Sequence, residues 1–219
     1  MTNLFNKLHS SKLLASIFST LNSCLKRELK KCSTVLDIGC GPSSPLQHCE
    51  SIEYSVGVEP YKPYLQKTKE KNIHNDYYDK KIESLNFEKN QFDAVIMLEV
   101  IEHLPKDAGF ELLKRSEKWA KKKIIISTPN GFLEQGESDE NPLQRHRSGW
   151  GVEELHSFGL AGLKLLRCEN QDDSMVEGNL LSSIRWQPKP FWFGVATLSQ
   201  ALTYYLPNFA FELFGVKEL

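Results

Sequence analysis

Two acidic residues and a histidine follow an apolar run near the middle of the chain, in the segment LEVIEHLP that begins at Leu98. Glu99, Glu102 and His103 are three and four positions apart, so they share one face if the stretch is helical. Three interpretations stay open. The cluster is purely structural; or His103, with Glu99 and His146 from a later loop, acts as a general base on a hydroxyl; or these four residues bind Mg²⁺, Mn²⁺ or Zn²⁺.

A glycine-rich bend earlier in the chain has the residue types that approach a nucleotide closely. The strand-like run before it contains Asp37, and Gly39, Cys40 and Gly41 form the bend itself. Residues without side chains let the backbone come near a ligand, and the backbone N–H groups then face it. Glu59 follows the next strand, about twenty residues on, where a carboxylate can accept two hydrogen bonds from a ribose diol.

The same bend argues against a dinucleotide. A dinucleotide fingerprint needs a third glycine three positions after the second, and this chain has Ser44 there. The carboxylate of Asp37 would also repel a phosphate group. The pattern therefore favours a nucleoside ligand that has a positive end and carries no phosphates.

Three segments, VLDIGCG, VGVEP and FDAVIMLEVIEHL, resemble the class I S-adenosylmethionine-dependent methyltransferases over about residues 33–129. The resemblance implies that S-adenosylmethionine is the cofactor and that adenine lies beside the residues after the third strand. Lys81 departs from the family there, because it stands at a position that is often acidic. The cofactor-binding residues that the resemblance implies are Asp37, Gly39, Cys40, Gly41, Glu59, Pro60, Ile82, Glu83 and Leu98.

The ExxEH segment resembles two groups within this superfamily. In the small-RNA 3′-terminal 2′-O-methyltransferases the equivalent acids and histidines bind a metal, which implies the ligand set Glu99, Glu102, His103 and His146. The segment is also similar to ubiquinone-type O-methyltransferases, which act on small hydroxylated molecules. The loop around His146 lacks the fuller HxH pattern of the RNA enzymes.

Apolar β-branched runs alternate with helical patterns from residue 34 to residue 127, which predicts a parallel sheet with helices on both faces. We expect a Rossmann-like, doubly wound α/β fold with a mostly parallel seven-stranded sheet and an antiparallel last strand. The predicted strands are 34–38, 54–58, a weak one within 76–82, 92–97, 123–127, 163–168 and 210–216. The predicted helices are one or two within 3–30, then 63–72, 106–121, 152–158 and 191–206.

The predicted domains are an N-terminal helical cap over residues 1–32 and a cofactor-binding domain over 33–219. Within the second, 131–150 is expected to be an active-site loop and 170–208 an aromatic insertion on the substrate side. The C-terminal part is rich in aromatic residues. Core packing, an apolar acceptor pocket, a homodimer surface and contact with a membrane surface are the four alternatives for it.

Composition limits the partners of the chain. The formal net charge of −1 provides no overall basic field for nucleic acid. Five cysteines without a CxxC pair, and no continuous apolar leader, indicate a cytoplasmic protein with reduced thiols. No apolar run is long enough to predict a membrane-spanning helix.

The function expected from these features is O-methylation of a small-molecule, glycan or lipid hydroxyl. The two alternatives are a metal-dependent RNA 2′-O-methyltransferase and a non-catalytic protein that binds S-adenosylmethionine or another nucleotide. The near-neutral charge counts against nucleic acid, and the intact glycines, Asp37, Glu59 and the ExxEH segment favour an enzyme.

Overall fold

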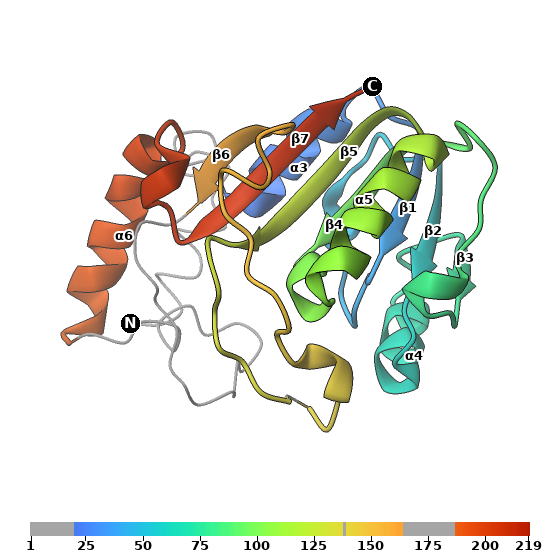
Figure 1. Ribbon diagram of the computed structural model, residues 1–219, viewed down its shortest axis with the longest axis horizontal. Helices are drawn as coiled ribbons and strands as arrows, with labels where there is room; N and C mark the ends of the chain where they lie inside the picture. The colour runs from blue at the N-terminus through green and yellow to red at the C-terminus, as the bar shows by residue number, and fades with distance from the viewer. Residues whose placement is uncertain (1–19, 138, 164–186) are drawn as a thin grey trace.

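The computed structural model describes residues 20–137, 139–163 and 187–219. These residues form one seven-stranded sheet in the order β3-β2-β1-β4-β5-β7-β6, with helices packed against it (Figure 1). The strands are β1 Thr34–Ile38, β2 Tyr54–Val58, β3 Asp76–Tyr78, β4 Phe92–Leu98, β5 Ala120–Pro129, β6 Gly159–Leu163 and β7 Glu212–Glu218. The α-helices are α3 Leu21–Leu29, α4 Lys62–Glu70, α5 Lys106–Trp119 and α6 Lys189–Thr203.

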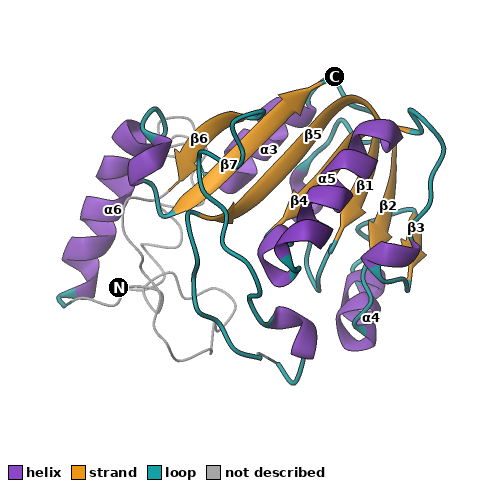
Figure 2. Ribbon diagram, in the orientation of Figure 1, coloured by secondary structure: helices purple, strands orange, loops and turns teal. Residues whose placement is uncertain are grey.

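Strands β1 to β5 run parallel, and β7 runs antiparallel between β5 and β6. This confirms the expected Rossmann-like α/β fold with its antiparallel last strand (Figure 2). Strands β1 and β4 are buried along nearly their whole length, as apolar strands covered on both faces must be. Ligands in such sheets bind beyond the carboxyl ends of the parallel strands.

Successive side chains along a strand point to opposite faces of the sheet, and there is a hydrophobic core on each face. On one side Val95 of β4 and Ile124 of β5 belong to the same core as Leu112 of α5. On the other side Ile125 of β5 shares a core with Leu25 of α3. The described part of the predicted N-terminal cap, residues 20–32, is therefore a covering layer of the sheet.

Local sequence explains where α3 begins. Thr20 and Ser23 form a capping box, in which the hydroxyl of each accepts a hydrogen bond from the backbone N–H of the other. Leu25 and Leu29, one helical turn apart, are both fully buried against the sheet. The part of the predicted helix before residue 20 lies outside the described residues.

The structure corrects several predicted boundaries. The weak third strand is Asp76–Tyr78, within its predicted range, and a short 3-10 helix η2, Ile82–Ser84, follows it. Strand β5 is longer than predicted and begins directly at the end of α5. The C-terminal helix and strand are each displaced by about two residues, within the usual error of such boundaries. Strand β6 ends where its predicted range begins; residues 164–168, and 170–186 of the predicted aromatic insertion, lie outside the described residues.

The predicted helix over residues 152–158 is wrong, because this stretch is a series of turns. Leu155 and Phe158 are buried at a helical spacing of three, which is the pattern that suggested a helix. Gly159 then begins β6 and pairs with Val216, so the chain must become extended immediately afterwards. Among the residues that the structure describes, no helix has both the length and the apolar character needed to cross a bilayer.

Candidate functional site

The glycine bend leaves the carboxyl end of β1 in a conformation that favours glycine. Gly39 has φ +70° and Gly41 has φ +58°, both in the left-handed region. The backbone N–H groups of Gly39 and Cys40 both donate to the carbonyl oxygen of Val58, at 2.8 and 3.1 Å. A Cβ atom added to Gly41 would meet no atom of the described residues within 4 Å, so space for a ligand adjoins the bend.

Glu59 lies beside this bend, as the spacing of the two segments predicts. One carboxylate oxygen accepts the N–H of Gly41 at 3.1 Å, and the other accepts the N–H of Tyr61 at 2.8 Å. The side chain is buried, which raises its pKa, and Asp79, directly after β3, raises it further. A carboxylate has about four acceptor sites, so Glu59 retains about two for the hydroxyls of a ribose.

Asp37 lies under the bend and is held by buried polar groups. The hydroxyl of Ser44 donates to Asp37 Oδ2 at 2.5 Å, and Nε2 of His74 lies 3.4 Å from the same oxygen. Burial raises the pKa of Asp37 to about 7 and lowers that of His74 to about 4. Nδ1 of His74 lies 3.1 Å from the hydroxyl oxygen of Ser55, which fixes the imidazole ring from its other side.

The residues expected near adenine are more spread out. Ile82 is half-buried against the core, and Arg115 of α5 donates to its carbonyl oxygen at 3.1 Å. Glu83 is exposed in the same 3-10 helix. Pro60 follows Glu59, and Leu98 ends β4, the strand next to β1. Their contacts with a cofactor stay predictions.

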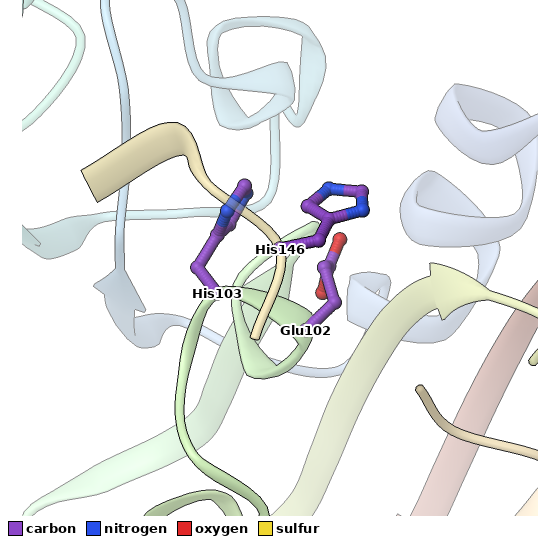
Figure 3. Close-up of side chains that lie close together, drawn as sticks. All are labelled: Glu102, His103 and His146. Atoms are coloured by element: carbon purple, nitrogen blue, oxygen red, sulfur yellow. The ribbon is translucent and has the colours of Figure 1, made fainter. Parts of the chain in front are cut away.

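Glu102, His103 and His146 come together at the carboxyl end of β4 (Figure 3). Glu102 and His103 belong to the 3-10 helix η3, Ile101–His103, and His146 comes from the loop after β5. One ligand atom from each residue lies within 4.8 Å of those from the other two. The rings of the two histidines are 4.8 Å apart between centroids.

Among the polar atoms of this cluster, one carboxylate oxygen of Glu102 has no hydrogen bond to any described residue. Oε2 of Glu102 accepts from the hydroxyl of Thr128 at 3.2 Å, whereas Oε1 is buried without a hydrogen bond to any described residue. Nδ1 of His103 lies 3.3 Å from the carbonyl oxygen of Arg145, and Nδ1 of His146 lies 2.8 Å from that of Leu133. Because a carbonyl only accepts, each Nδ1 carries the proton, and Nε2 is the nitrogen with the lone pair.

The electrostatics of the cluster follow from burial. Burial, and then the charge of Glu99, raise the pKa of Glu102 well above its ordinary value. Burial, and then His146, lower the pKa of His103 to about 4. His103 is therefore neutral at physiological pH, so one of its ring nitrogens keeps an unprotonated lone pair.

Glu99 does not share a helical face with Glu102 and His103. It has φ +54° and precedes η3, so the helical spacing on which that expectation depended does not apply. The hydroxyl of Ser127 donates to Glu99 Oε1 at 2.8 Å, and the residue is outside the close group of ligand atoms. Its charge still acts on Glu102.

The loop over residues 131–150 forms hydrogen bonds both to the histidine cluster and to helix α4, which follows Glu59. The N–H groups of Arg147 and Ser148 donate to the carbonyl oxygen of Glu102 at 2.8 and 3.0 Å. At the loop's outer end, the hydroxyl of Tyr64 donates to a carboxylate oxygen of Asp139 at 2.6 Å. Tyr64 belongs to α4, which follows Glu59, so the loop extends from the histidine cluster towards the glycine bend.

We expect Gly109→Ala to destabilise the fold by about 1–3 kcal/mol, because it overpacks the base of this loop. A Cβ atom at Gly109 would overlap Cζ2 of Trp150, a fully buried residue at the end of the loop. Gly136→Ala is the matched control, because a Cβ atom there meets no described atom within 4 Å. Urea unfolding measures both free energies, and equal stability of the two variants would refute the close packing of Trp150.

Sequence reasoning missed three residues around the site. His74 is buried against Asp37, Asp79 acts on the pKa of Glu59, and Asp139 joins the loop to α4. His74 had one signal in the sequence, a histidine in a short segment between a helix and a strand. The partners of all three depend on contacts between distant segments, which no local pattern specifies.

Residues 36–123 match the family model described as a methyltransferase domain. No curated protein matches the chain. Among similar solved structures is the methyltransferase domain of bacterial CtHen1-CN, with 17% identity, TM-score 0.54 and coverage of 90% of this chain and 97% of that one. A SAM-dependent methyltransferase from Archaeoglobus fulgidus has 20% identity, TM-score 0.51 and coverage of 94% and 98%.

A third structure, the PH0226 protein from Pyrococcus horikoshii OT3, is 25% identical with TM-score 0.46. That match covers 56% of this chain and 57% of that one, so it spans little more than half of either protein. The two longer matches agree with the observed sheet order in showing the fold. The chain therefore has the fold of S-adenosylmethionine-dependent methyltransferases, and its residues 36–123 are similar in sequence to a methyltransferase domain.

Proposed function

We propose that the chain transfers the methyl group of S-adenosylmethionine to a hydroxyl oxygen of a small-molecule, glycan or lipid acceptor. The observation that carries the proposal is the cluster of Glu102, His103 and His146 beyond β4, the strand that pairs with β1 and its glycine bend. A hydroxyl is a weak nucleophile, so it needs a group that takes its proton or polarises it. An amine or a thiolate would need neither.

The residues around the glycine bend fit S-adenosylmethionine. The open space at Gly41 admits the ligand, Glu59 has acceptor capacity for the ribose hydroxyls, and the carboxylate of Asp37 suits the ammonium group. When bound, the cofactor supplies an electrophilic methyl group. The protein's own contribution is to hold the two reactants in line and to exclude water.

The histidine cluster suits the acceptor in one of two ways. The lone pair on Nε2 of His103 can take the hydroxyl proton, and the loop that carries His146 can cover the acceptor. The same atoms also fit a divalent cation, because metal-bound histidines usually donate their second ring N–H to a carbonyl. Glu102, His103 and His146 would hold such an ion, and it would lower the pKa of the acceptor hydroxyl.

The buried Oε1 of Glu102 favours the cation. A buried carboxylate oxygen that no described group satisfies is costly unless a partner outside the protein does so. Neutral imidazole and carboxylate ligands accept Mg²⁺, Mn²⁺ or Zn²⁺. Isothermal titration with each metal, on the wild type and on Glu102→Gln, tests this. Binding that is equal in the two proteins would place any metal elsewhere.

A methyl-transfer screen identifies the acceptor class. The purified chain receives S-adenosylmethionine labelled in the methyl group, together with cell extract separated into RNA, lipid, glycan and small-molecule fractions, with and without a chelator. Label in a methyl ether of a lipid, glycan or small molecule supports the proposal. Label in RNA supports 2′-O-methylation instead, and label only on nitrogen or sulfur contradicts O-methylation.

Cofactor binding should weaken as the pH falls through the pKa of Asp37. That pKa is raised to about 7 by burial, and the ammonium group of the cofactor prefers the ionised carboxylate. Binding should therefore release a proton, and the affinity should decline between about pH 7.5 and 5.5, towards tenfold per pH unit. Calorimetry in two buffers of different ionisation enthalpy measures both effects. Asp37→Asn should give a flat profile, and a flat profile in the wild type would contradict this role of Asp37.

A further inference from the structure

Among the described side chains in the C-terminal half of α6, two polar ones are buried and two leucines are exposed. Gln200 and Thr203 are 7% and 1% exposed, whereas Leu198 and Leu202 are 70% and 68% exposed. A surface helix of a water-soluble protein normally has the opposite arrangement. The exposed leucines of α6 therefore indicate a surface that contacts a binding partner.

Several large apolar side chains of this segment are exposed. Phe191, Leu198 and Leu202 are seven and four positions apart, which places them on one side of α6, and further exposed apolar residues follow up to the end of the 3-10 helix η5, Pro207–Phe209. All are at least half exposed, and patches of this kind mark interaction sites. We call this group of exposed side chains the α6 patch; its residues are Phe191, Leu198, Leu202, Tyr205, Leu206 and Phe209.

The charges around the α6 patch point to its partner. The chain has 28 acidic residues in 219, yet residues 178–211 contain neither Asp nor Glu. The guanidinium of Arg27, which also pairs with Glu28 at 3.1 Å, donates to the hydroxyl of Tyr204 at the C-terminal end of α6, at 2.5 Å. An apolar face with aromatic side chains, on a segment that lacks acidic residues, is typical of helices that lie in an anionic membrane interface.

The size of the patch disfavours a second copy of the chain. A stable protein interface takes about 20–30 residues from each side, whereas the patch consists of a few large apolar side chains. A bilayer needs no matching surface, only apolar side chains that enter the interface and cations near the headgroups. At 15 residues α6 is too short to span a membrane, so it would lie along the surface.

The patch is linked to the carboxyl end of β5, where the site lies. The side-chain amide of Asn130, directly after β5, donates to the carbonyl oxygens of Pro207 and Ala210 at 3.2 and 2.9 Å. Thr128, two residues earlier, donates to Glu102. Figure 1 shows α6 beyond β6, at the edge of the sheet. A partner bound at the α6 patch would therefore have a fixed position relative to the histidine cluster.

We propose that the α6 patch docks the protein on the surface of an anionic lipid bilayer. Leu198 and Leu202 enter the interface, and the C-terminal end of α6, beside Arg27, lies near the headgroups. A further consequence, which rests on the proposed function, is that the acceptor hydroxyl belongs to a lipid or a lipid-linked molecule. The docking itself is independent of methyl transfer and is tested without cofactor.

Vesicle co-sedimentation of the full chain tests the docking. We expect binding to phosphatidylcholine vesicles that contain phosphatidylglycerol, and weaker binding to phosphatidylcholine alone or at high salt. The double variant Leu198→Glu, Leu202→Glu should reduce partitioning roughly tenfold or more. Leu219→Glu is the matched control, because this leucine is 50% exposed at the C-terminus, which lies away from α6 in Figure 1. Circular dichroism and thermal unfolding confirm that both variants fold.

Three outcomes would overturn the proposal. The wild type fails to bind anionic vesicles, or the double variant binds them as well as the wild type does. The third is a dimer in sedimentation velocity that the double variant converts to monomer while vesicle binding is absent. A chain that binds vesicles but transfers no methyl group would refute the proposed function and leave the docking site intact.

Discussion

His103→Ala is expected to slow methyl transfer roughly 10²–10⁴-fold while leaving the affinity for S-adenosylmethionine unchanged. His103 lies in η3 beyond β4, and its protonated Nδ1 is held by the carbonyl oxygen of Arg145. Nε2 is then the atom available to the acceptor or to a cation. Removing the ring removes that function and leaves Glu59 and the glycine bend in place.

The matched control for this variant is His156→Ala. His156 is an exposed histidine in the turns after the loop, and its Nδ1 lies 2.8 Å from a backbone carbonyl oxygen in the same way as that of His103. Single-turnover rates and calorimetric dissociation constants separate chemistry from binding. Unchanged turnover in His103→Ala would exclude both the base and the ligand role and leave His103 a structural residue.

Glu59→Ala is expected to raise the dissociation constant of S-adenosylmethionine by about a hundredfold or more. Two hydrogen bonds from ribose hydroxyls to a charged acceptor contribute about 1.5–3 kcal/mol each, and about 2.7 kcal/mol corresponds to a hundredfold. The variant also leaves the N–H groups of Gly41 and Tyr61 without their acceptor. We expect a smaller loss with Glu59→Gln, because its amide oxygen retains part of this acceptor capacity.

Glu53→Ala is the matched control for Glu59. Glu53 is an exposed acid just before the start of β2, whereas Glu59 directly follows the carboxyl end of the same strand. Thermal unfolding establishes that each variant is folded before affinity is measured. If Glu59→Ala binds the cofactor as tightly as Glu53→Ala does, the ribose is held elsewhere.

The central strands and the cofactor side of the site could be predicted from sequence because both depend on short segments. Residues 34–38 and 54–58 are apolar runs with polar residues at their carboxyl ends, and the structure has strands over those bounds. Parallel pairing then aligns the ends of β1 and β2, which brings Glu59 to the backbone of Gly41. The spacing between the glycine bend and Glu59, together with the parallel pairing of β1 and β2, was sufficient to predict this contact.

The histidine cluster was only partly predictable, because loop geometry decides it. The helical spacing predicted Glu99 on one face with Glu102, but a positive φ at Glu99 separates it from η3. His146 was a candidate by residue type alone. Its position depends on hydrogen bonds between the loop and the backbone of Glu102, which link residues more than forty positions apart.

The orientation of α6 could not be read from its sequence. Its apolar residues fit a helix packed against the sheet, and core packing was one interpretation. The structure instead buries Thr203 and exposes Leu202. The end of α6 packs closely on β6, because a Cβ atom at Gly162 would overlap the carbonyl oxygen of Thr203.

Calorimetric titration of the purified chain with S-adenosylmethionine, and separately with NAD, tests the cofactor site most directly. We predict that one molecule of S-adenosylmethionine binds per chain, with a dissociation constant in the micromolar range, and that NAD does not bind, because Asp37 disfavours phosphate. No heat from S-adenosylmethionine at millimolar concentration, or tighter binding of NAD, would contradict the cofactor site and the methyltransferase function built on it.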